Sequence, residues 1–423
     1  MRKNLSKFLK SEYIKNISVQ LLGTGVAQII PLLVMPVLSR IYLEEDFAKY
    51  TSFIALVSVL TVATGARYQY AIVLPKKNVD ALNVFLVSIY YTIAYSLLLL
   101  FLAIIINCFF DGLFNLNKSI FLVPIFILLQ GLWLSFLNLS VRQKKFKLNA
   151  ISKITQTSSN AVSTIIFGLS SISIGLIFGK ILGLLISVFF LFKRLPLKSY
   201  FLSKKTIKII SKRYIDFPKY NIIPSFFNAA STHAPVFFIG KYYSDLSLGY
   251  YGLAFMALAG PLSIISVSIK DVFYQRVSEI YNTNNFKKVF ETYRQSAFML
   301  LLISIPLTLF LFFSSEALFS FVFGDNWKIS GTFTTILVFS FGIKLIVSPL
   351  SIIFNVVNKL KTLSLWQTLY LITTFSTLGI SILYFNVNII MFLKIYVVHE
   401  VIMYLYYFFL QYSAIKNLKT NNQ

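Results

Sequence analysis

The chain has 423 residues, of which 57% are hydrophobic and only 13% are charged. Soluble domains carry roughly 25% charged residues, and apolar stretches of about 20 residues recur here from end to end, so the composition predicts a polytopic helical membrane protein. The net charge of +25 does not indicate nucleic-acid binding, because the cations are spread over alternate loops. Membrane lipids are the simpler partner for them. One cysteine and two histidines are too few for a disulfide or a structural zinc site.

Hydropathy predicts an all-α protein with twelve membrane spans, since roughly 20 apolar residues suffice to cross a bilayer. The predicted spans are 16–39, 50–74, 83–107, 119–140, 154–171, 174–192, 220–240, 248–269, 296–314, 332–356, 364–384 and 389–411.

The distribution of Lys and Arg predicts the orientation of these spans. Of the 39 Lys and Arg residues, 30 lie in every second gap between spans, five lie in the other gaps and four lie inside spans. Because cation-rich loops are retained on the cytoplasmic side, both termini are predicted to be cytoplasmic. The basic N-terminal stretch, Met1 to Lys15, precedes a full-length span without a small-residue cleavage site, so no removable signal peptide is predicted.

The longest basic connection, 193–219, divides the spans into two sets of six. We therefore predict an N-terminal six-helix bundle at 1–192 and a C-terminal six-helix bundle at 220–423. The connection mixes lysines with isoleucines, which fits either a helix lying on the membrane surface or a flexible linker.

The two halves also resemble each other in sequence. Residues 40–50 align with 241–251, each after the first span of its half, and 145–147 align with 359–361, each after the fourth. Six spans per half make such a repeat parallel, so the bundles are predicted to be related by a pseudo-two-fold axis along the membrane normal.

Three motifs, added to this layout, resemble one family. An acidic residue followed by Gly/Ala-x-Tyr comes after spans one and seven, Arg-Gln-Lys-Lys-Phe-Lys at 142–147 follows span four, and Phe-Gly-Asp-Asn-Trp at 323–327 lies in an outer loop. The chain resembles the polysaccharide exporters of the multidrug/oligosaccharidyl-lipid/polysaccharide (MOP) exporter superfamily, and among them the O-antigen flippases (Wzx-type).

The resemblance implies a function. Such a protein moves an undecaprenyl-diphosphate-linked oligosaccharide from the cytoplasmic to the periplasmic leaflet of the bacterial inner membrane, for O-antigen and lipopolysaccharide biosynthesis or a similar pathway. It implies alternating access between two bundles around a central cationic cavity. It also implies the lipid-linked oligosaccharide and polysaccharide assembly proteins as partners.

Four cations lie inside predicted spans, where an unpaired charge is costly. Arg67 in the second span lies about eight residues, roughly 12 Å, from the inner end, and Lys344 lies near the middle of the tenth. Both are predicted to bind the diphosphate, for which an Arg fork is well suited. Lys180 in the sixth span either lines the same cavity or snorkels to the surface, and Lys394 in the twelfth is predicted to snorkel.

Glu400 is the one acid inside a predicted span. It is either a site for proton or sodium coupling together with His399, or a structural counter-ion for a buried cation from another helix. His233 in the seventh span, between Pro224 and Pro235, is either a cavity contact of the substrate or a hydrogen-bonded core residue. No cofactor is predicted apart from a coupling proton or sodium ion.

Two other functions fit less well. A cation-coupled multidrug exporter of the same superfamily would bring acids into its bundles, whereas no predicted span of the first half contains a carboxylate. A membrane-embedded glycosyltransferase or polymerase would need paired acids or a metal site on an outer loop, and the outer loops here are short. The protein is therefore predicted to be a transporter and not an enzyme.

Overall fold

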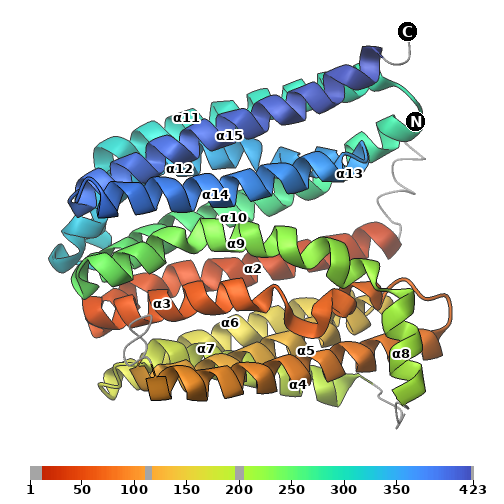
Figure 1. The fold of residues 1–423 in the computed structure, drawn as a ribbon, viewed down its shortest axis with the longest axis horizontal. Helices are drawn as coiled ribbons and strands as arrows, with labels where there is room; N and C mark the ends of the chain where they lie inside the picture. Colours follow the sequence, from red (N-terminus) through yellow and green to blue (C-terminus); the bar gives the residue numbers. More distant parts are fainter. Residues whose placement is uncertain (1–11, 110–116, 196–203, 421–423) are drawn as a thin grey trace. The chain divides into compact units, whose positions relative to one another are not determined.

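The computed structural model of the protein describes residues 12–109, 117–195 and 204–420 (Figure 1). The chain forms two compact units, unit 1 (Met1–Ala229) and unit 2 (Ala230–Gln423). The point of division lies inside a helix that crosses from one unit into the other. The boundaries predicted at 192 and 220 stay a prediction.

Unit 1 contains the helices of the first half and the connection that follows it. They are α2 (Glu12–Ile41), α3 (Glu44–Thr61), η1 (Thr64–Ala71), α4 (Asn78–Phe109), η3 (Asn117–Phe121), α5 (Leu122–Arg142), α6 (Phe146–Leu169), α7 (Gly175–Arg194) and α8 (Lys204–Arg213). Helix α9 (Asp216–Tyr242) is shared between the two units.

Unit 2 contains the remaining helices. They are α10 (Asp245–Asn282), α11 (Phe286–Phe323), η4 (Asp325–Trp327), α12 (Lys328–Val347), η5 (Pro349–Ile352), α13 (Ile353–Val356), α14 (Leu360–Leu383) and α15 (Ile389–Thr420).

The twelve predicted spans are all helical. Within the described residues, nine helices are long and apolar enough to cross a membrane, and α3 with η1 forms one further, bent span. The remaining two, α6 and α14, are helices of 24 residues each that carry more polar side chains. The predicted all-α, twelve-span architecture is therefore confirmed.

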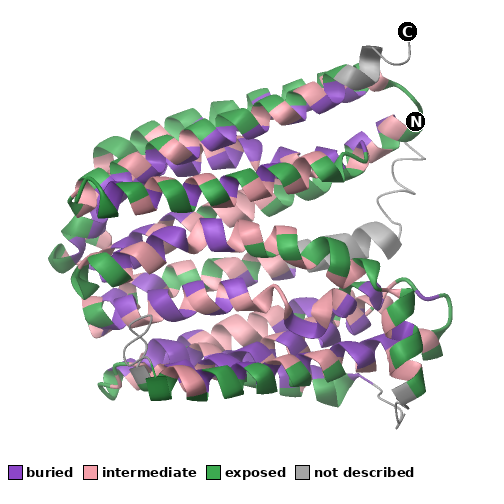
Figure 2. Cartoon of the chain, in the orientation of Figure 1, coloured by how far each residue is buried: buried purple, intermediate pink, exposed green. Residues whose placement is uncertain are grey.

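Apolar side chains cover much of the outer surface. Only 22% of the most apolar window of α4 and 17% of that of α11 is buried, and Figure 2 shows exposed residues running along both helices. Leu97, Phe101, Phe298 and Phe313 are among these exposed side chains. Helices with such faces fit a bilayer, where every backbone polar group must be bonded within its own helix. The protein is a multi-pass membrane protein.

In unit 1, the polar helix α6 packs between α2 and α7. Small residues allow this close approach: a Cβ atom on Gly179 would lie 2.0 Å from Thr164 Oγ1, and one on Gly23 would lie 2.3 Å from the Cβ of Ala150. Small residues at helix contacts are the usual means of close packing in membranes.

Both pairs of repeated segments have matching local structures. The hydroxyl of Tyr42 donates to the carbonyl of Thr164 at 2.7 Å, and that of the aligned Tyr243 donates to the carbonyl of Val387 at 2.7 Å. Each bond ties the end of the first helix of its half to the fifth helix or the turn after it. Burial raises the pKa of Tyr42 to about 12, so its hydroxyl remains a donor at neutral pH.

The second repeated pair forms the same turn. The N–H of Lys145 bonds the carbonyl of Ser140 at 2.9 Å, and the N–H of Lys359 bonds that of Phe354 at 2.8 Å. In each turn the preceding residue, Lys144 or Asn358, has a positive φ of 56° or 53°, which is a common way for a helix to end.

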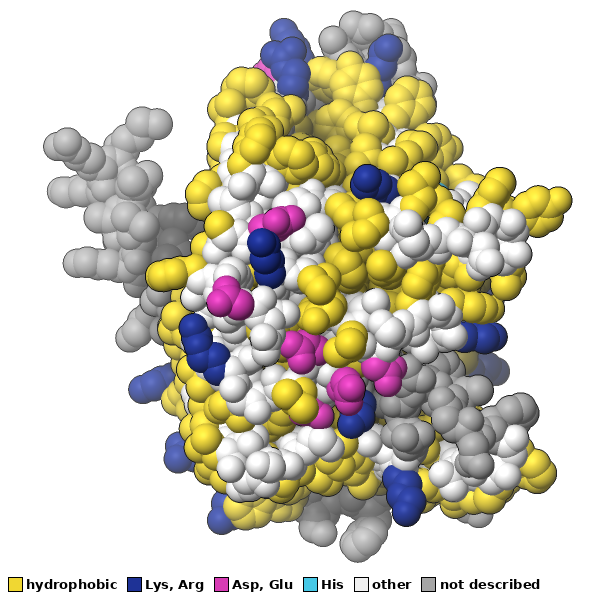
Figure 3. Space-filling model, turned by 90° about the vertical axis from the view of Figure 1, so that its left-hand side faces the viewer, with side chains coloured by type: hydrophobic (Ala, Val, Ile, Leu, Met, Phe, Trp, Pro, Cys, Tyr) yellow, Lys and Arg dark blue, Asp and Glu magenta, His cyan; other side chains and the backbone are white. Residues whose placement is uncertain are grey.

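Acidic residues occupy one end of unit 1, where α2 passes into α3. Glu44, Glu45 and Asp46 form the first turn of α3, where negative charge is favoured by the helix dipole. Figure 3 views this end, where acidic side chains lie among apolar and uncharged ones and a few Lys and Arg side chains. Basic residues lie at the opposite end of the unit 1 helices: Arg142 ends α5, Lys145 directly precedes α6 and Arg194 ends α7. The predicted basic N-terminal stretch lies, up to residue 11, outside the described residues.

One predicted loop is helical instead. The predicted connection 270–295 is formed by the ends of α10 and α11, which leave only a short turn around Asn284. Its apolar residues, including Val277, Val289 and Tyr293, are buried in the core of unit 2, and this packing extends both helices beyond their apolar spans.

The connection between the halves contains α8, while its residues 196–203 lie outside the described part. Ile207 and Ile210 of α8 pack into the core of unit 1 with Phe85 and Val188, and the helix contacts α4. Ile209 remains exposed. Residues 204–213 are therefore helical, and one face of this helix lies on the protein; its predicted place on the membrane surface stays a prediction.

The contact between α6 and α7 leads to a first prediction. Replacing Gly179 by Ala should lower the free energy of unfolding by about 1–3 kcal/mol, because the added methyl overpacks the helix contact. Gly25→Ala is the matched control, since a Cβ there would meet nothing within 4 Å. Thermal unfolding of the purified protein in detergent measures both. Equal transition temperatures for the two variants would contradict the packing described here.

Candidate functional site

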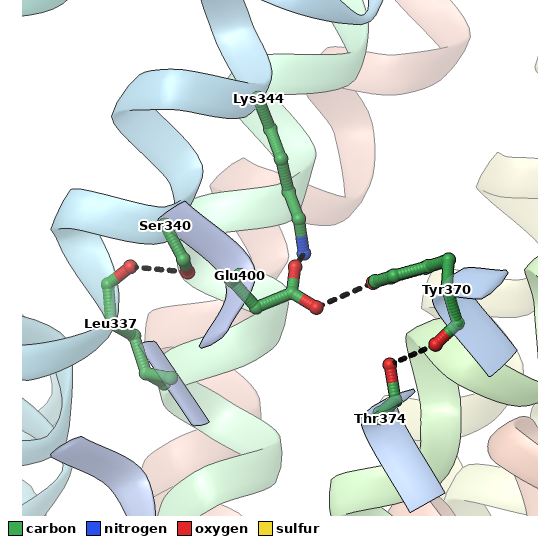
Figure 4. A network of polar contacts seen from close by, with 6 residues as sticks. All are labelled: Leu337, Ser340, Lys344, Tyr370, Thr374 and Glu400. Carbon is green, nitrogen blue, oxygen red and sulfur yellow. Dashed lines mark hydrogen bonds and ion pairs between the residues drawn. The ribbon is translucent and has the colours of Figure 1, made fainter. Parts of the chain in front are cut away.

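Lys344 and Glu400 form a buried ion pair in unit 2. Lys344 lies in α12 and Glu400 in α15, and Nζ of the lysine contacts Oε2 of the glutamate (Figure 4). Lys344 is 7% exposed and Glu400 is fully buried. The two helices pack side by side, so the pair spans a helix–helix contact at mid-span.

A third helix contributes to the same site. The hydroxyl of Tyr370 in α14 donates to Oε1 of Glu400 at 2.5 Å, so the two carboxylate oxygens have different partners (Figure 4). The ring of Tyr370 stacks on Trp366 with ring centres 5.0 Å apart, and Trp366 stacks on Tyr407 at 3.8 Å. This stack fixes the tyrosine that orients the carboxylate.

Aromatic rings surround the ammonium group of Lys344. Its Nζ lies 5.6 Å from the ring centre of Phe341, 5.8 Å from that of Tyr396 and 5.3 Å from that of Tyr404. Such rings attract a cation through their negative faces. Even so, desolvating two charges costs several kcal/mol for each ion, and a buried pair is weak evidence for stability. Ionisable groups at this depth usually mark a functional site.

Further titratable groups, on α15 and on neighbouring helices, lie around the pair. Nε2 of His399 lies 3.0 Å from Thr373 Oγ1, and its ring stacks on Tyr370 with ring centres 6.2 Å apart. Tyr251 of α10 interacts electrostatically with Glu400, and its buried hydroxyl has no hydrogen-bond partner among the described residues. His233 of α9 interacts electrostatically with Lys344. The centre of its ring lies 6.0 Å from that of Phe255.

Arg67 lies in unit 1, at a break in the second span. The span was predicted to be continuous over 50–74, but α3 ends at Thr61 and η1 follows at an angle of 55°. Gly65, Ala66 and Arg67 all have left-handed backbone angles, with φ of 55°, 45° and 63°. Consecutive residues in this conformation cannot continue a right-handed helix, which explains the break.

The side chain of Arg67 has no acidic partner within the part of the chain that the structure describes. It is half-buried, its Nη1 lies 3.4 Å from Tyr70 Oη, and its buried Nε has no hydrogen-bond partner among the described residues. No Asp or Glu of the described part lies within ion-pair distance of it. Strained backbone of this kind clusters at ligand sites, and broken membrane helices form the binding sites of many transporters.

The structure brings together only some of the predicted site residues. Lys344, Glu400 and His399 form one cluster with His233 nearby, whereas Arg67 and Lys180 lie on separate helices of unit 1. Lys180 is half-buried, with no acid in ion-pair distance among the described residues, and Lys394 is exposed. No three His, Cys, Asp or Glu side chains of the described part are grouped as metal ligands.

Tyrosines are the residues of this candidate site that the sequence analysis missed. Tyr396 and Tyr404 stand four residues before and after Glu400, a spacing that places all three on one face of α15. That spacing was a usable signal. Tyr370 and Tyr251 come from other helices, and no local pattern marks them.

Known proteins share this architecture. The sequence model of the family described as "Polysaccharide biosynthesis protein" matches residues 37–332. An inward-facing multidrug resistance MATE family transporter of the MOP superfamily superposes with a TM-score of 0.60 at 13% identity, over 98% of this chain and 100% of that chain. The lipid II flippase MurJ gives a TM-score of 0.69 at 16% identity, over 92% and 86% of the two chains.

A third structural neighbour is a MOP superfamily transporter from Pyrococcus furiosus, with a TM-score of 0.56 at 14% identity, covering 97% of this chain and 98% of that chain. No curated protein matches the sequence. At these identities the likeness shows the fold, and the predicted MOP transporter fold is confirmed.

The buried pair leads to a second prediction. Replacing Lys344 by Met leaves the Glu400 carboxylate buried without its cation, which should cost about 3–5 kcal/mol of unfolding free energy. Adding Glu400→Gln removes that charge and retains an acceptor for Tyr370, so the double variant should recover most of the loss. Lys394→Met, at an exposed lysine, is the control. Thermal unfolding of the wild-type protein, the single variants Lys344→Met and Glu400→Gln, the double variant and the control measures the coupling, and strictly additive losses would contradict the pair.

Proposed function

Because the chain belongs to the polysaccharide biosynthesis protein family, whose model matches residues 37–332, we propose that it is a flippase for undecaprenyl-diphosphate-linked oligosaccharides. It moves them across the bacterial cytoplasmic membrane by alternating access, in the synthesis of O-antigen or a similar surface polysaccharide. Both termini lie in the cytoplasm, as the alternating cations indicate. The observation that carries the proposal is the buried Lys344–Glu400 pair within a fold shared with the lipid II flippase MurJ.

The chemistry of the cargo supports this function. Its diphosphate carries about two negative charges, which cannot cross hydrocarbon without compensating groups. Arg67 offers a guanidinium with no acidic partner among the described residues, and this planar fork can bind two phosphate oxygens at once. Lys180 and His233 are further contacts of the cargo in this proposal. A site lined only by hydrogen-bond acceptors would repel the same head group, because the phosphate oxygens are themselves acceptors.

Lys344 supplies a second cation that is available only part of the time. While Glu400 is ionised, it holds the ammonium group. When Glu400 takes up a proton on Oε2, the attraction is lost and Lys344, still charged, is free to bind a phosphate oxygen. Release of the cargo and of the proton restores the pair. Tyr251, whose hydroxyl has no partner among the described residues, can then bond either state of the carboxyl group, and His399 can carry the proton.

A second candidate function is a cation-coupled multidrug exporter. The likeness to a multidrug resistance MATE family transporter and the buried Glu400 favour it. It differs in the charge of its cargo: an exporter of cationic drugs would keep Glu400 free to bind them, whereas Lys344 occupies this carboxylate. Drug-resistance assays set beside assays with lipid-linked sugars separate the two functions.

Arg67 leads to a third prediction. In a flippase-deficient strain that this protein complements, Arg67→Ala should abolish surface polysaccharide and leave lipid-linked repeat units on the cytoplasmic face. Arg276→Ala, at an exposed arginine, is the control and should complement fully. Membrane expression of each variant is quantified in parallel. Normal surface polysaccharide in a well-expressed Arg67→Ala strain would remove this residue from cargo binding.

Glu400 leads to a fourth prediction. In proteoliposomes, transport by the wild-type protein should respond to an imposed pH gradient, since Glu400 exchanges a proton in each cycle. Glu400→Gln keeps the hydrogen bond to Tyr370 but carries no exchangeable proton, so its residual transport should be insensitive to the gradient. His399→Gln is assayed beside it to test the relay. A Glu400→Gln protein with the wild-type rate and pH response would rule out coupling at this residue.

A further inference from the structure

Unit 1 contains an apolar groove between α4, α5 and α7. It has a volume of about 360 Å³ and is lined by Leu82, Phe85, Leu86, Ile89, Leu132, Phe136, Leu185, Val188, Phe189 and Phe192. Phe85 and Phe136 are buried and form its floor, with ring centres 5.3 Å apart. Leu185, Phe189 and Phe192 are 47%, 55% and 56% exposed, so the groove is open along α7.

The open side of the groove ends at two cations. Phe192 directly precedes Lys193 and Arg194, the last residues of α7. Nζ of Lys193 lies 4.3 Å above the ring of Phe189, which lines the groove, and the guanidinium of Arg194 lies 5.0 Å from the ring of Phe190. Both cations are exposed, and no acid of the described residues lies within ion-pair distance of either.

Helix α8 extends this basic end. Ile207 and Ile210 pack against the cluster that contains the groove residues Phe85, Phe136 and Val188. The opposite face of α8 exposes Lys205, Lys208 and Lys212. Among the described residues, the acids on this end of unit 1 are few: Glu12 at the start of α2, Asp80 in the first turn of α4 and Asp216 in the first turn of α9.

We propose that the groove is a binding site for one anionic phospholipid of the surrounding bilayer, with an acyl chain in the groove and the phosphate at Lys193 and Arg194. The lining offers no polar side chain for a sugar, so the groove suits a hydrocarbon chain. The cations at its lip favour an anionic over a zwitterionic head group. A second copy of this chain is a poor occupant, because it would bring a like-charged surface.

The site has a consequence for α8. A phosphate bound at Lys193 and Arg194 lies near α8, the helix in the connection between the two halves, and the exposed lysines of α8 can share the same head group. The lipid therefore fastens α8 to the core of unit 1. This role is independent of the cargo, since the groove and its cations include none of the proposed cargo-binding residues.

Lipid retention by the purified full-length protein tests the proposal. Native mass spectrometry, after exchange into phosphatidylglycerol or phosphatidylcholine with identical chains, reports the number and affinity of bound lipids. The wild-type protein should retain one phosphatidylglycerol in preference to phosphatidylcholine. Lys193→Gln and Arg194→Gln should each lower that affinity about fivefold, since one cation near a lipid surface contributes about 1 kcal/mol. Leu185→Trp fills the groove and should abolish retention of either lipid.

Two matched controls accompany these variants. Lys394→Gln removes an exposed lysine of α15, and Leu383→Trp enlarges an exposed leucine of α14; both should retain phosphatidylglycerol like the wild-type protein. Equal retention of the two lipids, or full retention in Leu185→Trp, would overturn the proposal. Displacement of phosphatidylglycerol by polyprenyl phosphate at equal concentration would also overturn it, because the groove would then serve the cargo's tail.

Discussion

The ion pair of Lys344 and Glu400 constrains unit 2 more than any other interaction. It places two opposite charges at a contact between α12 and α15, away from water, and Tyr370 adds α14 to the same point. Removing either charge leaves the other buried and unpaired, which is far costlier than the pair itself. The three helices must therefore keep their register, or the pair must be broken by a proton or by a competing anion. A site with these two options can act as a switch.

The pair also reduces the number of cations inside the predicted spans that lack an acidic partner. Four cations lie within the predicted spans, yet Lys344 is matched by Glu400 and Lys394 is exposed at the surface. Arg67 and Lys180 remain without an acidic partner among the described residues, and both belong to unit 1. The two halves share their turns after the first and fourth helices, but they differ in how they handle buried charge. Unit 1 holds, at a broken helix, an arginine with no acidic partner among the described residues, and unit 2 holds a paired lysine in the last turn of α12.

The sequence predicted the span architecture because hydropathy and the cation distribution depend only on local composition. It predicted the repeat because Tyr42 and Tyr243 occupy aligned positions. Each donates a hydrogen bond from the end of the first helix of its half to the fifth helix or the turn after it. The break at Gly65–Arg67 was missed, since its window is apolar enough to read as continuous and the left-handed turn follows from packing against α4. The extensions of α10 and α11 were also missed, because residues such as Val277 and Val289 are spaced for helix packing but surrounded by charge.

The partners of a buried charge could be predicted only in part. That Glu400 would meet a cation from another helix was one of two readings of the sequence. That the cation is Lys344, and that Tyr370 bonds the second oxygen, depends on helix contacts between residues far apart in the chain. Those contacts leave no periodic signal in a single sequence. The predicted binding role of Lys344 stays a prediction.

The exchange of the two charges tests the central claim most directly. In the double variant Lys344→Glu, Glu400→Lys, the buried pair is retained with its polarity reversed, so the protein should fold with nearly wild-type thermal stability. If Lys344 must present a cation to the cargo from α12 while Glu400 takes up the proton, flipping of a lipid-linked oligosaccharide in proteoliposomes should be lost. A stable double variant that flips the lipid-linked oligosaccharide at the wild-type rate would show that the pair is structural only.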